Sequence, residues 1–395
     1  MTPLPTSRQS STLSGPTSPS SSESWNRMDE TTRYLVERML YHSDPMARRL
    51  ALAKAVTLIE TKHPVKKLQA DQLLTFLLEQ QQNQNTQNEN FRIGLAGPPG
   101  AGKSSMIEAL GKYILDEKSA SAAGDDDKDH KSCRRYRPDK LAVVCIDPSS
   151  SVSGGSILGD KTRMEELSRH PRAFVRPSAN SGVVGGLAAY TDDVVSTCQA
   201  AGYPLVLLET VGLGQSEIDV AQSVDLLLLM LPPGGGDELQ GVKKGIMEVA
   251  DIFCVTKADG DLLTAAKHTA ADYRAAVKFL NSATYLASEA EEPWNPPVLL
   301  TSSATGDGLG ELWEAICRFK EHSEISGQLE KKRKRQAEFW MWKHLSKMVQ
   351  DKTHQDPQLA SVAENLQTKL LHSQITPRVA ASHLLDSLFQ QRRPH

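Results

Sequence analysis

Short apolar segments alternate with helix-length stretches through the middle of the chain. Seven such segments occur, at residues 92–96, 141–146, 173–175, 204–208, 224–231, 252–255 and 298–300. A strand that is apolar along its whole length is buried on both faces, which is typical of a parallel sheet between two layers of helices. The pattern therefore predicts an α/β core with a mostly parallel sheet and helices on both faces.

Helical patterns flank this core on both sides. Residues 33–80 contain no glycine, and their apolar residues recur at steps of three and four, the spacing of amphipathic helices. In residues 80–90, nine of eleven positions are Gln or Asn, which favours a solvated linker. The pattern becomes helical again after about residue 320. We therefore expect a helical extension at each end of the core.

The C-terminal extension opens with two conspicuous groups of side chains. The first is the basic run at residues 331–335, and the second is the aromatic cluster of Phe339, Trp340 and Trp342. A basic run on a helix is more often a solvated face than a nuclear signal or a nucleic-acid patch. We interpret the aromatic cluster as helix core or as a subunit contact rather than as a binding platform.

Two further segments have the composition of chain outside a folded core. Residues 1–22 contain 16 Ser, Thr or Pro, too polar to offset chain entropy by burial. This leader has only Arg8 and Arg27 as basic residues, so it matches a transit peptide loosely. Residues 116–140 are charged, include the run Asp125 to Asp127, and are predicted to be a surface insertion. The expected parts are thus a disordered leader (1–27), a helical extension with its linker (28–90), the α/β domain (91–320) and a helical arm (321–395).

Composition narrows the class of protein. The hydrophobic fraction is 39% before the 26 glycines are added, which is in the globular range, and the net charge of −3 provides no overall attraction to nucleic acid or to an anionic membrane. Five scattered cysteines contain no C-x-x-C pair, which argues against disulfides or a zinc ribbon and favours a reducing compartment. The longest apolar run, residues 226–231, is far shorter than the ~20 residues of a membrane span. We predict a soluble protein without nucleic-acid or membrane partners.

The strongest chemical signal follows the first predicted strand. Residues 97–104 match G-x-x-x-x-G-K-[ST] between that strand and a predicted helix. Glycines let backbone N–H groups turn toward phosphates, Lys103 supplies positive charge at the β and γ positions, and Ser104 offers its hydroxyl oxygen to Mg²⁺. The sequence predicts a nucleoside triphosphate site, formed by Gly97, Pro98, Pro99, Gly100, Ala101, Gly102, Lys103, Ser104 and Ser105.

A second motif, Thr256-Lys257-Ala258-Asp259, indicates which nucleotide base is recognised. It follows the predicted strand at residues 252–255. In the related N-K-x-D signature the carboxylate accepts from guanine N1–H and from the exocyclic amino group, which adenine does not offer. Asp259 therefore favours GTP over ATP. Thr256 stands where Asn is commoner, which leaves an Asn-type bridge to the phosphate loop open. Ser302, Ser303 and Ala304 follow the last strand and match the loop whose backbone N–H groups meet the guanine carbonyl.

Three acidic residues lie where a metal ion is expected. Asp147 and Glu209 follow predicted strands, and Asp160 lies in the glycine-containing segment 153–164. Mg²⁺ keeps several waters and takes one or two carboxylates, and parallel strands present their carboxyl ends at one edge. For each of these acidic residues, the alternative to a role in metal binding is a cap at a strand end or a surface ion pair. We predict that Ser104, Asp147, Asp160 and Glu209 hold Mg²⁺.

The segment 209–217 combines a strand-end acid with a possible switch. Gly212 lets the backbone approach the γ-phosphate, so the segment is predicted to change order with the nucleotide state. Gln215 is a candidate for orienting the attacking water. The predicted catalytic residues are Lys103, Glu209 and Gln215.

Several long motifs together resemble one family. They are residues 97–104, 147–150, 153–164, 209–217, 232–241 and 256–261. Their order and content closely resemble the methylmalonyl-CoA mutase-associated GTPase chaperones, over about residues 45–395. The leader, the Gln- and Asn-rich segment and the insertion at 116–140 depart from that family but include none of its motifs.

The resemblance implies a signal-recognition-particle-like P-loop GTPase fold and a homodimer held by the C-terminal helical arm. It further implies GTP hydrolysis to GDP that gates loading of adenosylcobalamin into methylmalonyl-CoA mutase and protects the mutase. A cobalamin adenosyltransferase would be the other partner. Eukaryotic members of the family work in the mitochondrial matrix, so this location is expected here, with the cytoplasm as the alternative.

Three other functions remain open. A GTPase for nickel insertion has a similar fold, but such proteins carry His-rich or Cys-His tracts that this chain lacks. A small-molecule kinase or transport ATPase would prefer ATP, and a module that holds GTP without turnover would release no phosphate.

Overall fold

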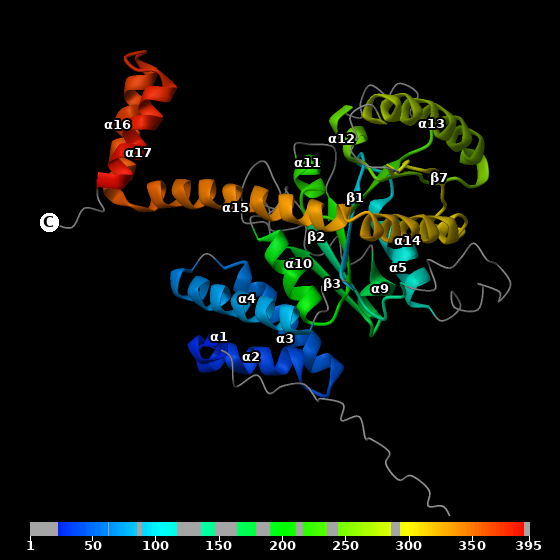
Figure 1. Cartoon of the computed structure of the whole chain (residues 1–395), viewed down its shortest axis with the longest axis horizontal. Helices are drawn as coiled ribbons and strands as arrows, with labels where there is room; N and C mark the ends of the chain where they lie inside the picture. The colour runs from blue at the N-terminus through cyan, green and yellow to red at the C-terminus, as the bar shows by residue number, and fades with distance from the viewer. Residues whose placement is uncertain are drawn as a thin grey trace, which may run out of the picture. The chain divides into compact units, whose positions relative to one another are not determined.

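The structure is a computed structural model, and it describes residues 23–61, 63–84, 89–116, 136–146, 164–178, 190–210, 216–234, 244–285 and 293–390. The chain forms two compact units, Met1–Ser323 and Glu324–His395. No helix among the described residues is both long enough and apolar enough to cross a membrane. Figure 1 shows the elements of both units.

The described core is built on one seven-stranded parallel sheet. Its strands are β1 (Phe91–Ala96), β2 (Leu141–Ile146), β3 (Ala173–Ser178), β4 (Leu205–Thr210), β5 (Leu226–Leu231), β6 (Ile252–Val255) and β7 (Val298–Leu300). Their order is β3-β2-β4-β1-β5-β6-β7, and every neighbouring pair is parallel. The prediction of seven apolar strands in a parallel sheet is confirmed.

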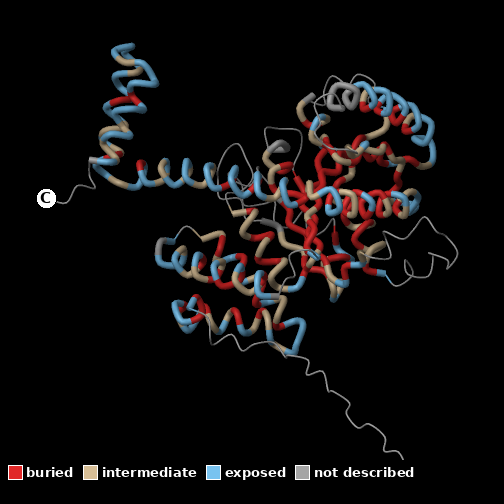
Figure 2. Tube along the Cα trace, in the orientation of Figure 1, coloured by how far each residue is buried: buried red, intermediate tan, exposed pale blue. Residues whose placement is uncertain are grey.

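Helices cover the sheet on both faces (Figure 1). They are α5 (Lys103–Leu115), α9 (Glu165–Arg169), α10 (Thr191–Ala200), α11 (Ser216–Ala221), α12 (Lys244–Val249), α13 (Leu263–Tyr285) and α14 (Leu309–Ile325). Every residue of β4 and β5 is buried, and Figure 2 shows the buried residues gathered in the sheet. The apolar strands thus follow from burial on two faces.

β4 continues further than its apolar residues suggested. Glu209 and Thr210 belong to the strand, because Glu209 pairs in register with Leu95 of β1 and with Cys145 of β2. The Thr210 hydroxyl also donates to the Leu95 carbonyl at 3.0 Å. Strand pairing on both edges of Glu209, and pairing with β2 together with the hydroxyl contact to β1 at Thr210, therefore hold two polar residues inside a buried strand.

The N-terminal extension is helical, as predicted. It consists of α1 (Glu23–Arg27), α2 (Glu30–Leu40), α3 (Pro45–Ile59) and α4 (Pro64–Gln84). Side chains fix two of the starts: Asp29 accepts from the Thr32 N–H at 3.1 Å, and Asp44 accepts from the Met46 N–H at 3.0 Å. α1 occupies residues 23–27 of the expected leader, and residues 1–22 lie outside the described part.

The Gln- and Asn-rich segment begins as helix. The expectation of a solvated linker is wrong for residues 80–84, which complete α4. Glutamine is a good helix former, and the amide of Gln81 donates to the Ser196 carbonyl of α10 at 3.3 Å. The contact attaches this end of the extension to a helix of the α/β core.

The C-terminal unit contains α15 (Gln328–Gln355), α16 (Pro357–Leu371) and α17 (Pro377–Gln390). Lys334 of the basic run pairs with Glu330, and both side chains are 75% exposed, as in a solvated helix face. In the aromatic cluster, Trp340 is buried and Trp342 is exposed.

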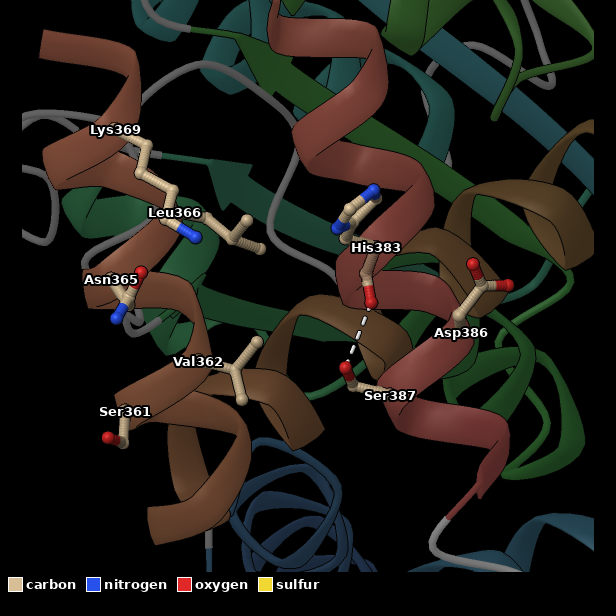
Figure 3. A pocket seen from close by; sticks show the side chains of 8 residues that line it. All are labelled: Ser361, Val362, Asn365, Leu366, Lys369, His383, Asp386 and Ser387. Atoms are coloured by element: carbon tan, nitrogen blue, oxygen red, sulfur yellow. Dashed lines mark hydrogen bonds between the residues drawn. The ribbon is translucent and has the colours of Figure 1, made fainter. Parts of the chain in front are cut away.

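A mostly polar cavity of about 450 Å³ lies between α16 and α17 (Figure 3). Lys369 of α16 and Asp386 of α17 are among the residues that line it, and the Ser387 hydroxyl donates back to the His383 carbonyl at 2.9 Å. The cavity is formed wholly within this unit.

Candidate nucleotide site

The phosphate loop joins β1 to α5 through three glycines with unusual backbones. Gly97, Gly100 and Gly102 have φ values of 153°, 80° and 86°, a region that disfavours residues with a Cβ. A Cβ on Gly97 would also lie 2.4 Å from the Met230 carbonyl oxygen of β5. The loop therefore needs these glycines to pass the neighbouring strand and to present its backbone at the start of α5.

Lys103 is the first residue of α5, and its side chain turns back over the loop. Its Nζ donates to the Gly97 carbonyl at 2.8 Å and to the Pro98 carbonyl at 3.1 Å, and the residue is 9% exposed. The ammonium is thus held above the loop, beside the N-terminus of a helix. Positive charge and helix N–H groups together suit an anion such as a phosphate.

Ser104, in the first turn of α5, and Glu209, near the end of β4, lie in contact. The Ser104 hydroxyl donates to Glu209 Oε1 at 2.5 Å, and Glu209 is 8% exposed. A hydroxyl and a carboxylate oxygen are hard ligands of the kind that Mg²⁺ takes. Among the described residues no group of three or more His, Cys, Asp or Glu could hold a metal, so this pair is the part of the predicted metal site that the structure brings together.

The two segments predicted to read the base also meet. The Ser302 hydroxyl donates to Asp259 Oδ2, and Ser302 is fully buried. The Ala304 N–H points at the Ser302 hydroxyl oxygen at 3.2 Å, so the seryl side chain links the 302–304 loop to the carboxylate. Sequence reasoning considered only the backbone of this loop. The role of the hydroxyl was missed, and only the serine itself hinted at it.

Lys257, two residues before Asp259, has an unusual backbone conformation. Its φ is 53°, one of two positive values among described residues other than glycine, and its side chain is exposed. The next residue, Ala258, donates its N–H to the Thr301 carbonyl at 3.0 Å. This left-handed step directs the chain toward Asp259.

Thr256 makes the bridge to the phosphate loop that the sequence left open. Its hydroxyl donates to the Ala101 carbonyl at 2.8 Å, and both residues are buried. A threonine can therefore tie the base-reading segment to the loop without the amide of an asparagine.

Replacing Thr256 by valine is expected to lower GTP and GDP affinity about tenfold. Valine keeps the branched shape but leaves the buried Ala101 carbonyl without its donor, a loss of about 1–3 kcal/mol. Titration of the purified variant with each nucleotide measures the effect. Thr256→Ser keeps the hydroxyl and should bind nearly as well as the original chain; equal affinity in the valine variant would show that the bridge has no role in binding.

The remaining predicted residues fall into two groups. Pro99 and Ser105 are exposed at the loop and on α5, and the Ser303 hydroxyl lies 4.0 Å from the Met106 sulfur. Asp147, Asp160 and Gln215 lie outside the described residues, as do most of the glycine-containing segment 153–164 and of the predicted switch segment 209–217. Their roles stay predictions.

The family model described as "Methylmalonyl Co-A mutase-associated GTPase MeaB" matches residues 52–123 and 132–358. These two stretches include the phosphate loop, Glu209 and both segments predicted to read the base, and together they exceed half of the chain. The chain belongs to this family. The predicted resemblance is confirmed.

Relatives and a solved structure agree with the match. The chain is 39% identical over 350 residues to the mouse "Methylmalonic aciduria type A homolog, mitochondrial". The matched stretch covers 88% of this chain and 78% of the mouse protein. It is 39% identical over 301 residues to "GTPase ArgK" of Escherichia coli, with 76% of this chain and 81% of that protein covered.

The crystal structure of "LAO/AO transport system kinase" superposes with a TM-score of 0.63 at 28% identity. It covers 91% of this chain and 99% of its own. This likeness and the parallel sheet confirm the predicted P-loop fold. The family member described here is therefore a P-loop protein of the mutase-associated GTPases.

Proposed function

We propose that this protein is a GTP-hydrolysing chaperone of adenosylcobalamin-dependent methylmalonyl-CoA mutase, which gates loading of the cofactor and protects or reactivates the mutase. The observation that carries the proposal is the match to the mutase-associated GTPase family across the whole nucleotide site. The cobalamin belongs to the partner in this proposal, and the chain contributes the nucleotide switch.

GTP would bind at the edge of the sheet where the phosphate loop follows β1 and the 302–304 loop follows β7. Residues 97–105 would surround the phosphates, and Lys103 would place its charge at the β and γ positions. Asp259 would accept from the guanine N–H groups, held in position by the Ser302 hydroxyl. Because adenine lacks those donors, ATP would leave the carboxylate without the hydrogen bonds that guanine supplies, which favours GTP.

Ser104 and Glu209 fit Mg²⁺, since two hard oxygens lie together at the start of α5. Mg²⁺ would neutralise the charge that develops on the phosphates. Asp147 and Asp160 remain proposed further contributors, and Gln215 remains the proposed residue that orients water. Glu209 would link the strand end to the following segment, which is the proposed switch.

The proposed assembly is a homodimer through the C-terminal arm. Met341, Leu345 and Met348 follow one another at steps of four and three on α15, and each is about half exposed. An exposed apolar stripe of this kind supports a protein contact.

A cobalamin adenosyltransferase is the proposed second partner. The mitochondrial matrix is the proposed location, supported by the name of the mouse relative.

Phosphate release from GTP and ATP, with and without the methylmalonyl-CoA mutase of the same source, tests the proposal. We expect GTP-selective turnover that changes when mutase is added. GTP-selective turnover that does not change when mutase is added would argue against the mutase as partner, but it would still support GTP hydrolysis. A preference for ATP would instead favour a kinase or ATPase, and bound GTP without phosphate release would indicate a binding module.

A further inference from the structure

A second cavity lies among the N-terminal helices, and none of its lining residues belongs to the nucleotide loops. It is formed by α2, α3 and the first turns of α4, and its volume is about 530 Å³. Sites for small molecules have volumes of roughly 300–1,000 Å³. The cavity therefore has the size of a small-molecule site.

One wall of this cavity is apolar beyond what the core requires. α3 buries Leu52, Val56 and Ile59 in the helical extension, as an amphipathic helix does. It also presents Leu50 and Leu58 to the cavity, and Leu50 is 55% exposed. α3 is thus apolar on a second face, whose exposure to water is unfavourable unless something covers it.

Every ionisable group that lines the cavity, the Tyr34 phenol aside, is a cation. Arg38 comes from α2, Lys54 from α3 and Lys66 from α4, and no acidic residue lines the cavity. The Arg38 guanidinium donates to the Tyr34 hydroxyl at 2.8 Å, a neutral partner that leaves its charge uncompensated. Within the described part of the chain, neither lysine forms an ion pair. The cavity is therefore positive in a chain whose net charge is −3.

Charge and apolar surface alternate along the same helix face. Leu50, Lys54 and Leu58 are spaced four residues apart on α3, so they follow one another along one side of the helix. Such an arrangement offers an apolar surface to a hydrocarbon chain and an ammonium to its charged end.

We propose that this cavity binds a small amphiphilic carboxylate, an unbranched acyl chain with one anionic head. The acyl chain would cover Leu50 and Leu58, and the head would lie between Lys54, Lys66 and Arg38. A docked protein partner usually covers about 800 Å² of surface, whereas this site is a pocket among three short helix segments. The volume and the charge together favour the small anion.

Calorimetric titration of the full chain with decanoate tests the proposal, with hydrogen exchange to locate the site. We expect saturable binding of one decanoate per chain and slower exchange in α2 and α3. Octanoate should bind more weakly by up to about fourfold for each methylene lost. Decanol, which has no charge, should bind at least about tenfold more weakly than decanoate.

Matched variants separate the cavity from general surface effects. Lys54→Met and Lys66→Met keep the length of the side chain and should each lower decanoate affinity about tenfold. Lys67→Met is the control, because Lys67 is next to Lys66 on α4 but does not line the cavity. Leu50→Glu should abolish binding, whereas Leu68→Glu, at a site 60% exposed, should not. Thermal unfolding of each variant reports whether it is folded.

Three results would overturn the proposal. The first is that decanoate shows no saturable binding at concentrations below about 1 mM. The second is equal binding of decanol, or an equal loss in Lys67→Met, since either would mean that the cavity cations do not hold the head. The third is protection of α2 and α3 that grows with protein concentration in the absence of decanoate, because a second copy of the chain would then cover the cavity.

Discussion

Lys103→Ala is expected to reduce GTP hydrolysis at least about 100-fold. Lys103 is the side chain that the structure holds over the phosphate loop, through the Gly97 and Pro98 carbonyls. Removing one preorganised donor from the place where charge develops costs about 2.7–4 kcal/mol of transition-state stabilisation, which is about 10²–10³ in kcat. Single-turnover phosphate release from labelled GTP measures the effect.

The control for this variant lies on the same helix. Lys112→Ala removes a partly exposed lysine of α5 that pairs with Glu166, and it should leave hydrolysis unchanged. Because Lys103 also binds two loop carbonyls, the unfolding temperature of each variant shows whether the loss is one of stability. Hydrolysis at the original rate in a folded Lys103→Ala protein would remove Lys103 from the catalytic residues.

The strands of the sheet were predictable because burial on both faces leaves a simple mark on the sequence. All seven strands contain an apolar run, and between helix-length stretches a short run of this kind is typical of a buried strand. The end of β4 was not predictable on this basis. Glu209 and Thr210 are polar. They stay in the strand because Glu209 pairs with β1 and β2, and because Thr210 pairs with Ile146 of β2 and donates its hydroxyl to β1.

The phosphate loop was predictable because its chemistry is local in sequence. Eight consecutive residues contain the glycines, the lysine and the serine, and the strand and helix beside them give the context. The Thr256 bridge was not, because its partner Ala101 is 155 residues away and only the fold brings the two together. The Ser302 hydroxyl on Asp259 is a second contact of this kind. Local motifs thus identified the pieces of the site, and tertiary structure decided how they connect.

Asp259→Asn is expected to lower GTP affinity about 100-fold or more and to transfer the preference to xanthosine triphosphate. A carboxylate accepts hydrogen bonds from both guanine N–H groups, and each bond to a charged group contributes about 1.5–3 kcal/mol. An amide offers one acceptor and two donors, which match a base with a carbonyl in place of the guanine amino group. Competition of GTP, ATP and xanthosine triphosphate against a labelled guanine nucleotide for the original chain, and against labelled xanthosine triphosphate for the variant, measures the change.

Asp261→Asn is the matched control, because Asp261 is an exposed carboxylate two residues further along. It should leave the order of the three nucleotides unchanged. Asparagine at position 259 keeps an oxygen that can accept from the Ser302 hydroxyl, so the loop at 302–304 should stay in place. Unaltered GTP affinity in Asp259→Asn would exclude this carboxylate as the base reader. A loss of GTP binding with a gain of xanthosine triphosphate would place the base against Asp259, since a damaged fold loses affinity for both.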